Sequence, residues 1–160
     1  MTVSQMVPAL TRRRVVAADR AFVLGLVRAE RRAALTASGL PAAALAHLVD
    51  VQVRAWLAGP GGSGEQHLFE VAGVPVAHLV LAHGPSTRVV WIAVAAEHRR
   101  RGVAGAVLRT VLDEASTADR AVDLHVDPAN TAAVALYHSL GLRPVGTTGA
   151  DLHLSTREPS

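Results

Sequence analysis

The stretch that decides the fold is Val90–Gly105, which reads VWIAVAAEHRRRGVAG. It begins with apolar residues of high β-propensity, passes through three consecutive arginines, and leads into Gly102–Ala118, where apolar residues recur with a helical period. A strand, a short basic loop and a helix form the arrangement in which free backbone N–H groups bind an anion, typically a phosphate. The alternative is a solvated surface turn, because runs of charge are common at protein surfaces.

The glycines of this loop favour a ligand site without identifying a nucleotide. Gly102 and Gly105 would let a ligand approach the backbone closely. The loop is not a Walker loop, because no Gly-Lys-Ser/Thr follows, and it lacks a full G-x-G-x-x-G fingerprint. From the residues alone, both the phosphate site and the solvated turn stay open.

Outward from this stretch, the chain alternates between short β-rich runs and segments of helical period. Helices are expected to begin at Asp19 and Pro41 and to cover Gly102–Ala118 and Asn130–Leu140, and a glycine-rich loop, Gly59–Gly64, ends the second of them. Strands are expected at Thr11–Val16, His67–Ala72, Val74–Ala82, Thr87–Val94, Ala121–Val126, Leu142–Thr147 and Leu152–Ser155. The order predicts an α/β (α+β) fold with one mixed central sheet of about six to seven strands, flanked by about four helices.

The composition limits the classes of protein that remain. A length of 160 residues with 50% hydrophobic and 18% charged residues predicts one globular domain over residues 1–160. The absence of cysteine excludes disulfides and thiolate catalysis. No metal site is expected, because none of the eight histidines shows His-x-x-x-His spacing. No apolar run approaches the roughly 20 residues of a membrane-spanning helix, so a cytoplasmic protein without a membrane partner is expected.

Two motifs resemble those of one enzyme family. Val90–Val94 followed by Arg99-x-x-Gly102-x-Ala104 resembles the acetyl-CoA-binding motif of the GNAT-superfamily N-acetyltransferases, whose core is Arg/Gln-x-x-Gly-x-Gly/Ala. Further along, Asn130 is followed seven residues later by Tyr137 and then by a Leu-Gly-Leu helix end, which resembles the second motif of the same family. The two motifs cover about Val89–Pro144.

The resemblance implies how acetyl-CoA would bind, with coenzyme A as the product. In this family the strand ending at Val94 splays from the strand ending at Val126, and the V-shaped gap holds the pantetheine arm. The backbone N–H groups of the loop would hold the pyrophosphate. The implied cofactor-binding residues are Ile92, Ala93, Val94, Arg99, Arg100, Arg101, Gly102, Val103, Ala104, Gly105, Asn130 and Tyr137.

The resemblance also implies the chemistry of the transfer. Tyr137 would be the general acid that protonates the departing thiolate, although a helix tyrosine more commonly serves packing alone. Some relatives place a glutamate base on the strand before the second motif, and His125 stands there in this chain. His125 is therefore either a base or a packed strand histidine. Glu70, His78 and Glu97 are weaker candidates for the base.

Three functional classes follow. The first is an acetyl-CoA-dependent N-acetyltransferase that moves an acetyl group to a primary amine by direct attack in a ternary complex. Its acceptor would be a small molecule or a protein N-terminus, and a homodimer is compatible with the family. The second is a non-catalytic acyl-CoA-binding sensor or interaction module of the same fold. The third, a nucleic-acid binder, is disfavoured by the net charge of only +3 and by an aromatic content of 3%, so no nucleic-acid partner is expected.

Overall fold

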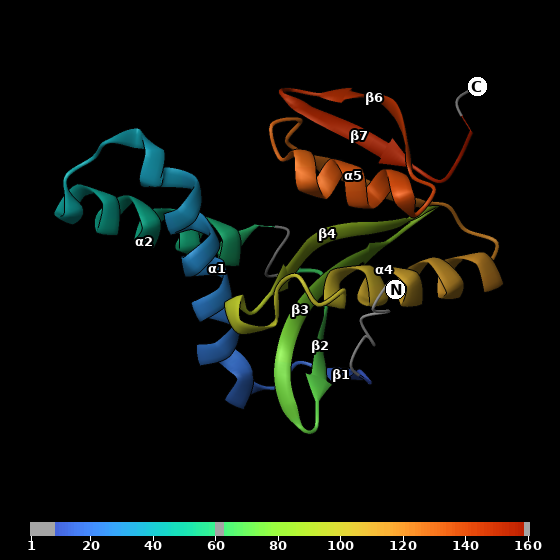
Figure 1. The fold of residues 1–160 in the computed structure, drawn as a ribbon, viewed down its shortest axis with the longest axis horizontal. Coiled ribbons are helices and arrows are strands. Elements are labelled where there is room, and N and C mark those ends of the chain that lie inside the picture. The colour runs from blue at the N-terminus through green and yellow to red at the C-terminus, as the bar shows by residue number, and fades with distance from the viewer. Residues whose placement is uncertain (1–8, 60–62, 159–160) are drawn as a thin grey trace, which may run out of the picture.

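A mixed β-sheet forms the centre of the molecule. The computed structural model describes residues 9–59 and 63–158, and within them one sheet has seven strands in the order β1-β2-β3-β4-β5-β7-β6 (Figure 1). Neighbouring strands are antiparallel except for β4 and β5, which run parallel. The predicted mixed sheet is thereby confirmed. The strands are β1 (Thr11–Arg14), β2 (Glu65–Val71), β3 (Val74–His83), β4 (Thr87–Val94), β5 (Val122–Val126), β6 (Arg143–Thr148) and β7 (Asp151–Ser155).

The helices begin close to where the sequence predicts them. The described residues form four α-helices, namely α1 (Arg20–Leu35), α2 (Ala42–Ala58), α4 (Val103–Thr117) and α5 (Thr131–Ser139). Pro41 precedes α2, where a fixed φ of −56° prepares the first turn. Of the predicted loop Gly59–Gly64, residues 60–62 lie outside the described part of the chain. Among the described residues, no helix has the length and apolar character needed to cross a membrane.

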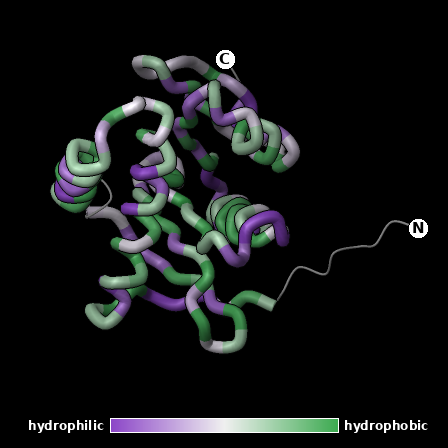
Figure 2. The backbone as a smooth tube through the Cα atoms, turned by 60° about the vertical axis from the view of Figure 1, so that its left-hand side comes forward, coloured by the Kyte–Doolittle hydropathy of each residue, from purple (hydrophilic) through white to green (hydrophobic). Residues whose placement is uncertain are grey.

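Two hydrophobic cores lie on opposite faces of the sheet. The first packs α4 and α5 against one face, with Leu79, Leu124 and Tyr137 among its buried members. The second packs α1 and α2 against β2, β3 and β4 on the other face, through residues such as Val27, Val49 and Trp91. Figure 2 shows hydrophobic residues along the strands in the middle of the molecule and on the helices around them. Alternation along the central strands therefore directs successive side chains to one helical layer and then to the other.

A bulge in β4 opens the sheet at its centre. The pairing of β3 with β4 skips Val90, because Val80 pairs with Trp91 whereas Leu81 pairs with Val89. On its other edge, β4 pairs with β5 only through Thr87, Arg88 and Val89 among the described residues. The two parallel strands therefore separate after Val89. This splay is the V-shaped gap expected between the strands that end at Val94 and Val126.

Candidate active site

The loop after β4 turns the chain sharply towards α4. After the short helix η3 (Ala96–His98), Arg100 adopts φ 61° and Gly102 adopts φ 75°. A left-handed conformation suits glycine but is uncommon for arginine. These two residues fold the basic segment back against the first turn of α4. The side chains of Arg99, Arg100 and Arg101 are exposed there.

The first turn of α4 presents backbone donors without partners. Among the described residues no side chain caps this helix, and its first bond is donated by Ala106 N–H to the Gly102 carbonyl at 3.0 Å. The N–H groups of Val103, Ala104 and Gly105 therefore have no acceptor within their own helix. A cluster of free N–H groups at a positive helix end, flanked by arginines, is suited to a phosphate or pyrophosphate.

The edge of β4 at the splay offers further backbone groups. Ala95 donates its N–H to the Val76 carbonyl on the β3 side at 2.8 Å. Because backbone groups alternate along a strand, those of Ile92 and Val94 face the splay, whereas those of Ala93 face β3. The Val94 carbonyl accepts a hydrogen bond from Arg99 Nε at 3.1 Å. An extended ligand in the gap would meet the polar groups of Ile92 and Val94 as a neighbouring strand would.

Tyr137 lies in the buried face of α5, next to this gap. Its side chain is 9% exposed and belongs to the core under α4 and α5. Burial raises the pKa of the Tyr137 hydroxyl, and the negative charge of Glu30 raises it further. The phenol therefore keeps its proton at neutral pH.

Glu30 is a charged residue that acts on Tyr137 and that sequence reasoning missed. It lies on α1, on the opposite face of the sheet from α5, yet its charge acts on Tyr137. Desolvation by the surrounding protein raises the pKa of Glu30, and the positive charges of Arg31 and Arg99 act in the opposite direction. The charge of Glu30 is therefore coupled both to Tyr137 of α5 and to Arg99 of the basic loop. A glutamate within an arginine-rich helix gives no sequence signal for such a position.

His125 lies on β5 near the open end of the splay. Its neighbours Leu124 and Val126 belong to the core under α4 and α5, so the His125 ring points to the other face of the sheet. Its Nε2 lies 3.3 Å from Thr148 Oγ1 of β6. Burial lowers the pKa of His125, as do the nearby His153 and Arg88. The imidazole is therefore neutral near pH 7 and able to accept a proton.

The weaker candidates for the base occupy other environments. Glu70 accepts a hydrogen bond from Arg13 Nε at 2.9 Å, and this pair links β2 to β1. His78 is completely buried, bonds to Gln66 Oε1 at 3.0 Å, and has its pKa lowered to about 4 by burial and then by His67. Glu97 is exposed on η3. The structure therefore groups His125, but not Glu70 or His78, with the splay.

Asn130 is a helix cap in this structure. It is the N-cap of α5, and its Oδ1 accepts a hydrogen bond from Ala133 N–H at 3.3 Å. Its side chain is exposed at the start of the helix that carries Tyr137. As the N-cap, Asn130 fixes the residue at which α5 begins. The start of α5 in turn sets the position of Tyr137 relative to the sheet.

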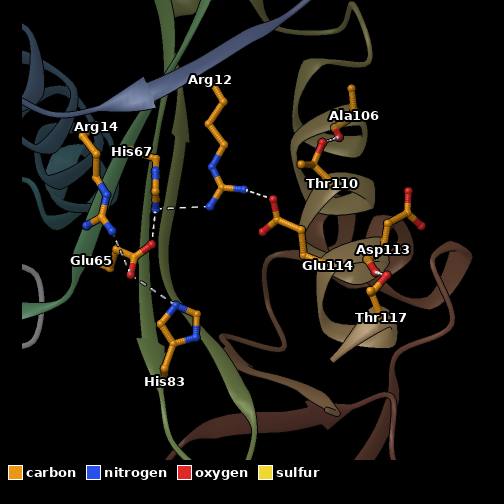
Figure 3. A network of polar contacts seen from close by, with 10 residues as sticks. All are labelled: Arg12, Arg14, Glu65, His67, His83, Ala106, Thr110, Asp113, Glu114 and Thr117. Atoms are coloured by element: carbon orange, nitrogen blue, oxygen red, sulfur yellow. Dashed lines mark hydrogen bonds and ion pairs between the residues drawn. The ribbon is translucent and has the colours of Figure 1, made fainter. Parts of the chain in front are cut away.

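A second group of charged side chains lies away from the splay (Figure 3). Arg12 of β1 donates to Glu114 of α4 at 2.5 Å, and its other terminal nitrogen lies 3.2 Å from His67 Nε2. Glu65 lies 2.6 Å from His67 Nε2 and 3.5 Å from His83 Nε2. These contacts connect β1, β2, β3 and α4 into one ionic network. In residues 9–59 and 63–158, no group of three or more histidine, aspartate or glutamate side chains could hold a metal ion.

Comparisons with known proteins agree with this geometry. The family described as the Acetyltransferase (GNAT) family matches residues 38–142 of the chain. No curated protein sequence matches it significantly.

Solved structures resemble the whole fold. The PaiA N-acetyltransferase of Thermoplasma acidophilum, in complex with coenzyme A, has a TM-score of 0.71 at 10% identity, over 94% of this chain and 99% of that chain. The ribosomal-protein-S18-alanine N-acetyltransferase of Escherichia coli has a TM-score of 0.65 at 19% identity, over 92% of each chain. The putative acetyltransferase YncA of Salmonella typhimurium, with its cofactor acetyl-CoA, has a TM-score of 0.58 at 17% identity, over 94% of this chain and 95% of that chain. At these identities the likeness concerns the fold.

Proposed function

The chain belongs to the acetyltransferase (GNAT) family, and on that premise we propose that it transfers an acetyl group from acetyl-CoA to a primary amine. The observation that carries the proposal is the uncapped first turn of α4 beside the splay of β4 and β5, with Tyr137 at the same gap. The proposal treats residues 1–160 as one domain, because the sheet runs from β1 near the start to β7 near the end of the chain.

The residues at the gap fit the chemistry of coenzyme A. The N–H groups of Val103, Ala104 and Gly105 would bind the pyrophosphate, with the exposed Arg100 and Arg101 adding positive charge. The backbone groups of Ile92 and Val94 would pair with the amides of the pantetheine arm. For Val94 this requires the Arg99 side chain to release the carbonyl that it now binds. Asn130 would lie at the start of α5, beside the arm.

Two side chains would move the protons of the reaction. Bound acetyl-CoA would supply a thioester carbonyl that a neutral amine attacks, and the C–S bond breaks as the C–N bond forms. Tyr137 would give its phenolic proton to the sulfur, since its raised pKa keeps the phenol protonated at neutral pH. His125 would take the proton from the amine. If Nε2–H of His125 donates to Thr148 Oγ1, the Nδ1 lone pair remains free to accept it.

The experiment that tests the proposal follows free thiol release from acetyl-CoA with a panel of amines. We expect turnover by the wild type and a loss of about 10²–10⁴-fold in kcat for Tyr137→Phe, the range typical of a general acid. Calorimetry should give a similar Kd for coenzyme A in both proteins. An equal kcat for Tyr137→Phe would remove Tyr137 from the mechanism, and a wild type that gives no heat signal with acetyl-CoA would contradict the proposal.

A second candidate function, an acyl-CoA-binding sensor without turnover, makes a different prediction in the same assay. Such a protein would bind acetyl-CoA but release no thiol with any amine of the panel. The protonated phenol of Tyr137 and the neutral imidazole of His125 favour the enzyme over the sensor. Binding of acetyl-CoA alone requires neither a proton donor nor a proton acceptor. For His125→Ala, the acidic limb of the pH–rate profile should disappear; an unchanged limb would exclude His125 as the base.

A further inference from the structure

Two histidines face each other across β5 and β7, on the side of the sheet away from α4 and α5. His125 and His153 are direct cross-strand partners in the antiparallel pairing. Their rings are stacked, with centroids 4.8 Å apart and planes inclined by 26°. The β5–β7 register fixes this contact, because opposed residues of one pair project to the same side of the sheet.

The charged groups near His153 differ from those that act on His125. His153 Nε2 lies 3.6 Å from Asp123 Oδ1, an ion-pair distance beyond hydrogen-bond length. This buried nitrogen has no hydrogen-bond partner among the described residues. Asp123 is held in place by the hydroxyl of Ser86, which donates to Oδ2. The Asp123 carboxylate therefore places a negative charge beside the His153 ring.

The surroundings of His125 oppose a proton there. Apart from its burial, the main opposing groups are His153 of β7 and Arg88 of β4, whereas Asp151 of β7 and Asp123 of its own strand favour the charged form more weakly. The contact from β6 is the neutral Thr148 hydroxyl.

We infer that His153 is a positioning residue for His125: it holds the His125 ring by stacking, and a positive charge on His153, beside Asp123, opposes a proton on His125, which keeps His125 neutral. Two imidazolium rings at 4.8 Å would repel each other, so a proton on one ring disfavours a proton on the other. The catalytic consequence rests on the proposed role of His125 as the base. With that role, the pair extends the pH range of the acetyl transfer towards the acidic side.

Proton NMR of the wild type, without cofactor or acceptor, tests the coupling of the two rings directly. The ring Cε1–H signals of the two histidines are assigned and followed as the pH is lowered. We expect each signal to respond at the midpoint of the other. If the two rings titrate independently, the inference is wrong.

Variants separate the charge of His153 from its packing. In His153→Phe the ring stack is kept and the charge is removed, so His125 should become protonated at a higher pH than in the wild type. His153→Gln removes the charge without an aromatic ring and should shift His125 in the same direction, which covers a failure of the first variant to fold. His47→Gln, an exposed histidine on α2, is the matched control and should leave the His125 titration unchanged. An unchanged His125 midpoint in both His153 variants would overturn the inference.

The rate measurement distinguishes this inference from the proposed function. With an active wild type, the acidic limb of the kcat profile should move to higher pH in His153→Phe, while the rate on the alkaline plateau changes little. If the NMR midpoints shift as expected but no amine is acetylated, the coupling of the two rings stands and the proposed function fails. If the enzyme is active but its acidic limb stays in place, His153 does not act through a base at His125.

Discussion

Tyr137 is the single tyrosine of the chain, so its ionisation can be followed without interference from another phenol. Burial raises its pKa first, and the charge of Glu30 adds to this shift. We predict that Glu30→Gln lowers the pKa of Tyr137, because the variant removes a negative charge that opposes formation of the phenolate. The alkaline titration, followed by the ultraviolet absorbance of the phenolate, should therefore move to lower pH.

The control for this titration is Glu97→Gln, the same change at an exposed glutamate of η3 that does not act on Tyr137. It should reproduce the wild-type curve. Coincident curves for Glu30→Gln and the wild type would show that α1 does not reach the site as described. A shift in both variants would point to a general effect of net charge.

At the scale of single residues, local motifs were informative and long-range partners were not. Tyr137 and His125 could be named as candidates because their positions follow from spacing within one strand–helix segment, and their roles stay predictions. His153 and Glu30 could not be identified, since their roles depend on the β5–β7 register and on the packing of α1. The packing partner of Trp56 was likewise not predictable: it is Trp91 of β4, with ring centroids 5.4 Å apart.

Among the structural elements, β4 is a strand whose bounds could be predicted from the sequence but whose bulge could not. Its bounds, Thr87–Val94, agree with the apolar pattern. The bulge at Val90 could not be predicted, because Val89, Val90 and Trp91 are all apolar and no glycine marks the irregularity. The splay was expected only through the family resemblance, whereas the bulge supplies its physical cause.

The left-handed turn before α4 gives a prediction at the same scale. Gly102 has φ 75°, and Gly73, in the turn between β2 and β3, has φ 78°. Alanine at either position should cost about 1–2 kcal/mol, because a left-handed conformation crowds the Cβ atom. Only Gly102→Ala should also weaken the binding of coenzyme A, since Gly102 orients the free N–H groups of the first turn.

Thermal unfolding and calorimetry of the two variants check this prediction. Both melting temperatures should fall by similar amounts, about 2–8 °C for a chain of this length. A Cβ atom at Gly73 would have no described atom within 4 Å, so the strain of the left-handed backbone is the main cost of alanine at that position. Equal losses of affinity for coenzyme A in the two variants would contradict a binding role for the loop at Gly102.

At the scale of the whole molecule, the layers of helices and strands were predictable. The short β4–β5 pairing, which connects β1–β4 with β5, β7 and β6, was not. The order of strands and helices indicates a mixed sheet with helices packed on it, and hydrophobic periodicity identifies the buried faces. The limited pairing of β4 with β5 depends on tertiary register. Among the described residues, this parallel pair covers only Thr87–Val89, so the two halves of the sheet are hydrogen-bonded to each other over a short length.

A ligand that fills the splay should therefore stabilise the whole molecule as well as the loop. At 100 times its Kd, coenzyme A should add about 2.7 kcal/mol to the free energy of unfolding and raise the melting temperature by about 5–10 °C. The amides of Ile92 and Val94, which face the gap, should exchange with solvent more slowly once the pantetheine arm pairs with them.

Adenosine 3′,5′-bisphosphate, used at the same multiple of its own Kd, supplies the matched comparison because it carries the nucleotide without the pantetheine arm. It should raise the melting temperature by a similar amount, since stabilisation at a fixed saturation does not depend on which contacts provide the affinity. It should leave the exchange of Ile92 and Val94 as in the free protein. Slower exchange at both amides with the bisphosphate alone would mean that the pantetheine arm does not pair with β4. The splay would then result from the bulge and would not be the cofactor site.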